Sequence, residues 1–192
     1  MNTLAALAIV CVAGLILGAC ERGGAKMVDE VEDAVSVPVG QTSARAAGSN
    51  LVSAYISNAY MGDLYGIQAA NIAVERSGDE RVRALAQGLR AEHSASRASL
   101  AATAAGEAPA DKLPGWLDQR RSGLVENLRS ASAADFDKVY LDQQIAALEE
   151  AQTLNRGFAD HADSPGLLKH ALGAVPDVEA RLRQARHLRA SL

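Results

Sequence analysis

The sequence predicts an all-α protein whose main part is a four-helix bundle, with an extra short helix in the crossover between helices 2 and 3. Three observations support this prediction. Helix-forming residues, above all alanine, leucine, arginine and glutamine, recur along most of the 192-residue chain. No run shows the period-two alternation of β-branched and aromatic residues that is typical of strands. Four long segments carry apolar residues at helical spacing, and prolines interrupt the chain between the second and the third.

Residues 1–19 are predicted to be a lipoprotein signal peptide. They carry no charged side chain and lead into the tetrapeptide LGAC, which ends at Cys20. LGAC resembles the lipobox of bacterial lipoproteins, in which the cysteine receives diacylglycerol and becomes the first residue of the mature chain. A basic n-region is missing, so an uncleaved apolar anchor is the alternative. Arg22 and Lys26 would then favour a cytoplasmic body.

The lipobox resemblance also predicts where the protein resides. After cleavage Cys20 is the only cysteine, so no intramolecular disulfide is expected. The residue that follows is Glu21 rather than the aspartate of the enteric inner-membrane retention signal, which favours the outer membrane, facing the periplasm. The membrane is therefore a predicted partner through the lipid on Cys20. Residues 20–48 mix glycine, serine, a proline and acidic residues, and we interpret them as a flexible tether.

Charge argues against nucleic acid as a partner. The formal net charge is −4 and the isoelectric point is near 5.6. A chain with this balance has no basic surface that could neutralise a row of phosphates. No protein partner is identified by the sequence.

The bundle domain is predicted over residues 49–192. Ser49 is placed to cap a first helix that starts at Asn50. Apolar residues repeat along one face of this helix: Ile56, Tyr60, Ile67, Ala70 and Val74. Asp63 falls on the same face, so its carboxylate is predicted to point inward.

A second helix is predicted after Gly78, with Asp79 as its cap. The apolar stripe of this helix contains Val82, Leu85 and Leu89. His93 continues the stripe one turn later, so its imidazole is also predicted to point inward. We expect a neutral imidazole that forms a hydrogen bond with Asp63 or with a backbone group.

Residues 104–116 cannot remain helical throughout, because they contain Pro109 and Pro114. A shorter amphipathic segment follows, with its apolar residues at Trp116, Leu117, Leu124 and Leu128. The link between the second and third long helices is therefore a long crossover, which is typical of ferritin-like bundles.

The third long helix is predicted over residues 133–162, with Asp137 and Gln144 on a strip beside its apolar face. Ser164 as cap and Pro165 at the first position begin the last helix. Pro176 should kink this helix rather than end it, because the apolar spacing resumes in register on both sides.

Three segments of the chain resemble the bacterial domain of unknown function 4142. They are AEH at 91–93, FDKVYLDQQIAALEEA at 136–151 and LLKHALGAVPDVEARLRQARHL at 167–188, and FDxxYLxQQ is the most specific part. The resemblance covers roughly residues 50–190. It implies a secreted or lipid-anchored protein with a ferritin-like helical bundle.

The resemblance also implies a set of inward polar positions. Asp63 matches the acid of the first helix, and Glu92 with His93 matches the acid and histidine of the second. At the two further positions where the family carries histidine, this chain has Leu148 and Arg181. The chain therefore resembles a degenerate member of the family.

Neither a metal site nor an active site is predicted. Bundles that bind two iron ions carry a glutamate three residues before a ligand histidine, and none of the four histidines here is preceded in this way. Zinc needs three or four converging ligands, and only Asp63 and His93 are expected to face each other. His161, His170 and His187 are expected at the surface. Glycine-rich phosphate loops and GxSxG motifs are missing.

The sequence thus favours a lipid-anchored envelope protein that acts as a structural or interaction module, without enzymatic activity and without a cofactor. The alternative is a metal-binding, ferritin-like envelope or stress protein. Leu148 and Arg181 favour the first interpretation, since each replaces a potential histidine ligand.

Overall fold

The computed structural model of the chain describes residues 52–106, 113–160 and 164–192. Across these ranges the structure contains α-helices and no strand, which confirms the all-α prediction. The helices are α3 (Val52–Arg76), α4 (Glu80–Ala104), α5 (Gln119–Ser130), α6 (Phe136–Ala159) and α7 (Pro165–Ala190). The predicted cap Ser49 and the predicted start at Asn50 lie outside the described residues.

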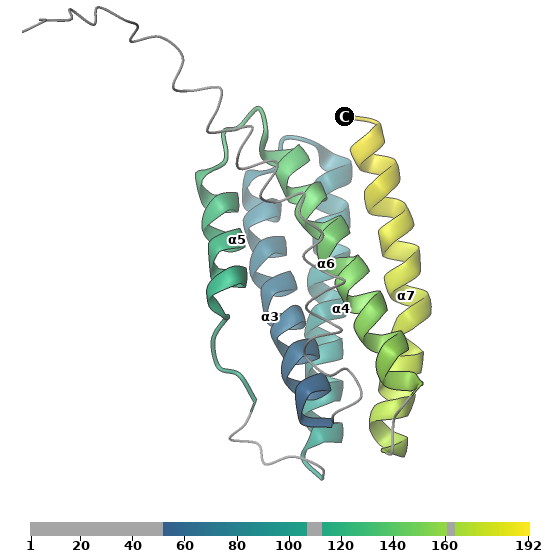
Figure 1. Ribbon diagram of the computed structural model, residues 1–192. Coiled ribbons are helices and arrows are strands. Elements are labelled where there is room, and N and C mark those ends of the chain that lie inside the picture. The colour runs from purple at the N-terminus through teal and green to yellow at the C-terminus, as the bar shows by residue number, and fades with distance from the viewer. Residues whose placement is uncertain (1–51, 107–112, 161–163) are drawn as a thin grey trace, which may run out of the picture. The chain divides into compact units, whose positions relative to one another are not determined.

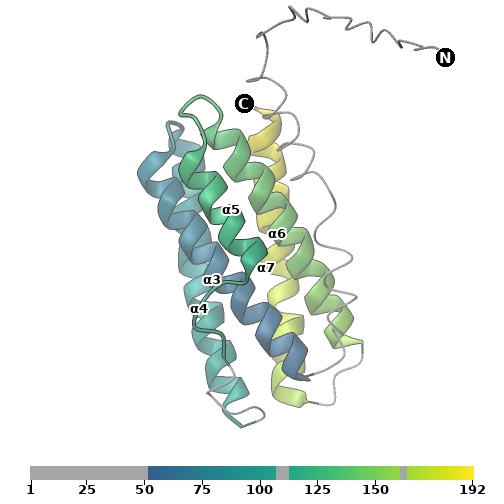
Figure 2. The same cartoon turned by 60° about the vertical axis from the view of Figure 1, so that its left-hand side comes forward.

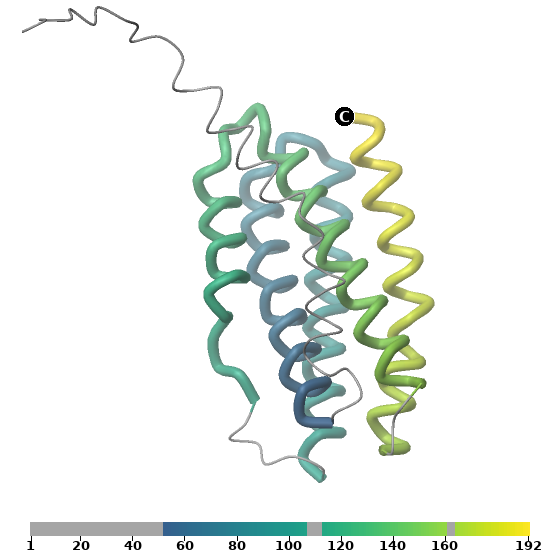
Figure 3. Tube along the Cα trace, in the orientation of Figure 1, coloured from purple at the N-terminus to yellow at the C-terminus, as the bar shows by residue number. Residues whose placement is uncertain are grey.

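The four long helices form a bundle, and α5 lies beside it (Figure 1). Short connections join α3 to α4 and α6 to α7, and each pair packs closely side by side. Contacts of α3 with α6, and of α4 with α7, join the two pairs, while α5 packs on α3 and α6. Because the chain returns through α5, α4 and α6 run in the same direction, as the trace in Figure 3 shows. The predicted bundle with a short helix in its crossover is confirmed.

Helix caps account for several boundaries. The Asp79 carboxylate accepts a hydrogen bond from the Arg81 backbone N–H at 2.7 Å, as a helix N-cap does. The Ser164 hydroxyl caps α7 in the same way, with Pro165 directly after it. Both caps were predicted. α7 also continues through Pro176 rather than ending there.

Two predicted boundaries were wrong. α6 begins at Phe136 rather than at 133, because Ser132 accepts hydrogen bonds from the Asp135 and Phe136 backbone N–H groups and closes a turn before the helix. α5 begins only at Gln119, after the N-cap Asp118. Trp116 therefore precedes the helix and is 81% exposed, instead of lying on its apolar face.

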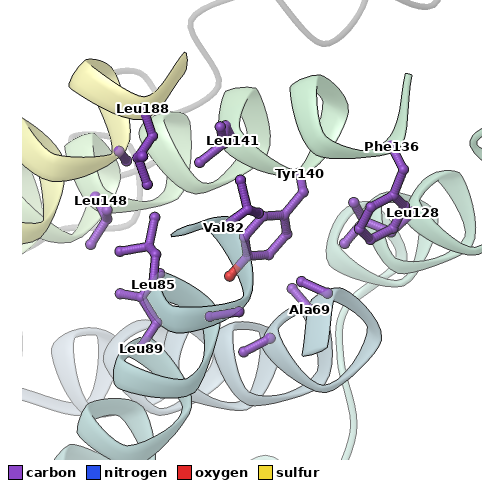
Figure 4. Packing of buried hydrophobic residues seen from close by; sticks show 14 of the residues in the cluster. Ala69, Val82, Leu85, Leu89, Leu128, Phe136, Tyr140, Leu141, Leu148 and Leu188 are labelled. Atoms are coloured by element: carbon purple, nitrogen blue, oxygen red, sulfur yellow. The ribbon is translucent and has the colours of Figure 1, made fainter. Parts of the chain in front are cut away.

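The apolar interior consists of two clusters. The large core occupies the half of the bundle that contains the end of α7 (Figure 4), and its largest buried members are Tyr65, Leu85, Leu89, Leu128, Phe136, Tyr140 and Leu141. The small core lies toward the start of α3 and comprises Tyr55, Ile56, Tyr60, Leu100, Ala104, Leu154, Phe158, Leu167 and Ala171. Along α3 and α4, Asp63 and His93 lie between these clusters.

Ion pairs attach α5 to α6. The two helices lie side by side in Figure 2. Arg121 is 5% exposed and bonds Glu150 of α6 at 2.8 Å and Asp118 of its own helix cap at 2.5 Å. Arg120 also bonds Glu150, at 2.9 Å. Because Glu150 receives both guanidinium groups, this carboxylate is the main polar link between α5 and α6.

None of the helices that the structure describes combines the length and the apolar character needed to cross a bilayer.

Candidate functional site

The interior polar pair of the bundle is Asp63 on α3 and His93 on α4. Asp63 Oδ1 and His93 Nδ1 lie 2.9 Å apart, so the ring N–H donates to the carboxylate. Asp63 is 7% exposed, and the His93 side chain is 20% exposed. Of the two partners predicted for His93, Asp63 or a backbone group, the structure shows Asp63. The contact spans the boundary between the two cores.

Gly66 explains how the His93 ring fits against α3. A Cβ atom built on Gly66 would lie 2.3 Å from His93 Cδ2 and 2.4 Å from Nε2, well inside van der Waals contact. The ring therefore rests on the helix backbone, where any side chain would displace it. Sequence reasoning missed this role, although an isolated glycine inside a helical pattern is a known sign of close packing.

The second carboxylate oxygen of the pair has no protein partner. Asp63 Oδ2 is buried and forms no hydrogen bond with the described residues. Nδ1 of His93 bonds Asp63, while the Cδ2–Nε2 edge of the ring faces the place where a Gly66 side chain would begin. Among the described residues Nδ1 therefore has a hydrogen-bond partner and Nε2 has none.

Glu92 pairs with Arg181 of α7 at the edge of the bundle. Arg181 Nε lies 2.9 Å from both carboxylate oxygens, and the hydrogen bond to Glu92 raises the pKa of Arg181. The Glu92 side chain is 40% exposed. Glu92 therefore lies at the edge rather than pointing fully inward as predicted, because the long arginine side chain draws the carboxylate toward α7. Arg181 stands where the family resemblance places a histidine.

His170 of α7 is half-buried and bonds a residue of the small core, so its predicted position at the surface was wrong. His170 Nδ1 is 2.9 Å from the Tyr55 hydroxyl, and this hydroxyl also donates to Asn155 Oδ1 at 2.8 Å. The Tyr55 ring stacks on Phe158 with ring centroids 3.9 Å apart. Burial lowers the pKa of His170, although the Asp63 carboxylate and the Ser96 backbone oppose this effect.

The remaining candidate residues, Asp137 and Gln144, lie on α6, and neither forms a hydrogen bond with Asp63 or His93. Asp137 Oδ2 accepts a hydrogen bond from the Asp79 backbone N–H at 3.3 Å, where α4 begins. Gln144 is 1% exposed, and its Nε2 has no hydrogen-bond partner among the described residues. Leu148 packs in the large core. The five candidate inward residues therefore do not meet at one site.

Two histidines remain. His187 is exposed near the end of α7, as predicted. His161 lies outside the described residues. In the described ranges no three or more histidine, cysteine, aspartate or glutamate side chains are grouped so that they could hold a metal ion.

Sequence reasoning also missed a buried amide network. The Tyr65 hydroxyl donates to Gln143 Oε1 at 2.8 Å, and Gln143 Nε2 donates to Asn127 Oδ1 of α5 at 3.0 Å. Gln143 belongs to the QQ pair of the most specific sequence motif. This motif therefore contributes a hydrogen-bonded contact among α3, α5 and α6, which the helical period alone does not indicate.

Comparison with known proteins gives a family and a fold. The family model described as "Domain of unknown function (DUF4142)" matches residues 37–188. No curated protein matches the chain. A solved structure titled "CopM in the Cu(II)-bound form" is similar in fold, with a TM-score of 0.63 and 14% sequence identity. The similarity covers 72% of this chain and 95% of that chain.

Proposed function

The chain belongs to the DUF4142 family, and we propose that it is a lipid-anchored protein of the bacterial cell envelope whose bundle is a structural or interaction module. The tetrapeptide LGAC supports the anchor, with Cys20 as the lipidated residue. The proposed location is the outer membrane, facing the periplasm. Neither enzymatic activity nor binding of nucleic acid forms part of the proposal.

One observation carries the proposed role of the bundle. The polar side chains at the family's inward positions pair with each other: Asp63 with His93, and Glu92 with Arg181. A buried or half-buried carboxylate that already has a basic partner is stabilised without a ligand. The pairs therefore serve to fix the positions of α3, α4 and α7 relative to one another.

Mass spectrometry of the native N-terminus tests the anchor. We expect the purified protein to begin at Cys20 and to carry a diacylglycerol group, because LGAC supplies the small residues and the thiol that processing requires. A Cys20→Ser variant should remain unprocessed. An N-terminus at Met1, or cleavage of the Cys20→Ser variant at the same bond, would contradict the proposal.

Metal binding is the second candidate, since a solved structure similar in fold is titled as a Cu(II)-bound form. Asp63 Oδ2 favours this candidate, because it is a buried carboxylate oxygen without a protein partner. The hydrogen bond of His93 Nδ1 to Asp63 Oδ1 counts against it, since this bond engages one nitrogen of the ring and one oxygen of the carboxylate.

Thermal melting distinguishes the structural role from metal binding. The lipidated protein is used because its lipid occupies the thiol of Cys20, which would otherwise bind added metal itself. If the pair is structural, a chelator should leave the melting temperature unchanged, and His93→Ala should cost about 1–3 kcal/mol, the price of an unsatisfied buried hydrogen-bonding group. A melting temperature that falls with chelator, recovers with Cu(II) and no longer responds in the His93→Ala variant would establish the second candidate instead.

A further inference from the structure

Trp116, the only tryptophan of the chain, is held in an exposed position by ordered structure. Its side chain is 81% exposed, whereas large aromatic side chains are mostly covered in folded domains. On one side of it Leu113 packs on the small core, and on the other Leu117 packs on the large core. The Asp118 cap then fixes the chain at the start of α5. The indole is therefore presented on the flank of the bundle.

The surroundings of Trp116 fit a lipid surface. The stretch LPGWL at 113–117 contains no charged side chain. Tryptophan, like tyrosine, is enriched where proteins meet the headgroup region of a bilayer, since its ring is apolar and its N–H needs a polar partner. An uncharged stretch around the indole can insert just below the headgroups without carrying a charge into the hydrocarbon region.

The position of Val52, where the N-terminal segment joins the bundle, also supports the bilayer as the partner of Trp116. Val52, the first described residue, packs on the small core, as does Leu113. Thirty-one residues separate Cys20 from Val52, so a lipid on Cys20 would keep the bundle within about 110 Å of the bilayer. At this short range a weak contact becomes effectively intramolecular and needs little intrinsic affinity.

We propose that Trp116 and its uncharged neighbours form a second membrane contact, which lays the α5 flank of the bundle on the bilayer to which Cys20 is anchored. The inference rests on the proposed lipid anchor and deepens it by assigning the face that meets the membrane. A protein partner at Trp116 is the competing outcome of the test.

Fluorescence of the single tryptophan tests this contact. The full-length lipidated protein is reconstituted in vesicles of equimolar phosphatidylethanolamine and phosphatidylglycerol, with or without acyl chains brominated near the headgroup. We expect the emission of Trp116 to lie at shorter wavelength in vesicles than that of N-acetyltryptophanamide in buffer, the reference for a fully exposed indole, and to lose intensity with brominated lipid. Emission that is neither shifted nor quenched would overturn the proposal and leave Trp116 free for a protein partner.

A matched variant places the indole on another flank. Leu172 on α7 is 54% exposed, and its neighbour Ala171 packs on the same small core. α7 packs on α4 and α6, whereas α5 packs on α3 and α6. The double variant Trp116→Ala, Leu172→Trp should show no quenching by brominated lipid. Equal quenching at both positions would mean that the bundle meets the bilayer without a preferred face, and would also overturn the proposal.

Flotation of the same vesicles distinguishes a failure of the lipid anchor at Cys20 from a failure of the membrane contact at Trp116. A lipidated protein floats with the vesicles whether or not Trp116 is present, because the acyl chains supply the attachment. Protein that fails to float refutes the anchor. Protein that floats but shows no quenching refutes only the contact at Trp116.

Discussion

A Gly66→Ala substitution should destabilise the bundle by about 2–4 kcal/mol, even though alanine is the better helix former. The new Cβ would lie 2.3 Å from the His93 ring, so the ring must leave its place against α3. Its hydrogen bond to Asp63 would then be lost, and the carboxylate would stay buried with neither oxygen paired. Urea unfolding followed by circular dichroism measures the effect.

Gly62, one turn earlier on the same helix, is the matched control. A Cβ on Gly62 would meet nothing within 4 Å, so Gly62→Ala should stabilise the protein by up to about 1 kcal/mol. Combining Gly66→Ala with His93→Ala should remove the clash, and the alanine at 66 should then cost nothing further. If Gly66→Ala is as harmless as Gly62→Ala while His93 is present, the ring does not lie where the structure places it.

The second large effect is expected at Glu150, which holds α5 against α6. Glu150→Gln keeps the size of the side chain but removes the charge that Arg120 and Arg121 share. Arg121 is almost completely buried, so its guanidinium would lose most of its compensation. We expect a loss of about 3 kcal/mol, at the low end for a broken buried pair because Asp118 still contacts Arg121.

Glu126, in α5 itself, supplies the comparison for Glu150. It pairs with Arg129, and both side chains are more than half exposed. Glu126→Gln should therefore change the free energy of unfolding by less than about 1 kcal/mol. Similar losses from the two substitutions would show that the Glu150 pair is no more important than an ordinary surface pair. Hydrogen exchange should also locate the loosening caused by Glu150→Gln in α5.

The sequence determined what depends on local periodicity and on side chains near in the chain. The caps Asp79 and Ser164 were predicted because a capping side chain bonds a backbone N–H only two or three residues away. Asp63 and His93 were placed inward because each lies on the apolar stripe of its own helix. The long crossover followed from prolines that no helix interior accepts.

Apart from the predicted Asp63–His93 pair, only the tertiary structure decided which side chains meet, because contacts between helices depend on their relative rotation and shift along the bundle. Nothing in the spacing around His170 indicates Tyr55, which is 115 positions away in the chain. Glu92 likewise reaches Arg181 across a gap of 89 positions. The rotation and shift that bring such pairs together are fixed by close packing across several helices at once, including the fit of the His93 ring on Gly66. A pattern read one helix at a time does not contain that information.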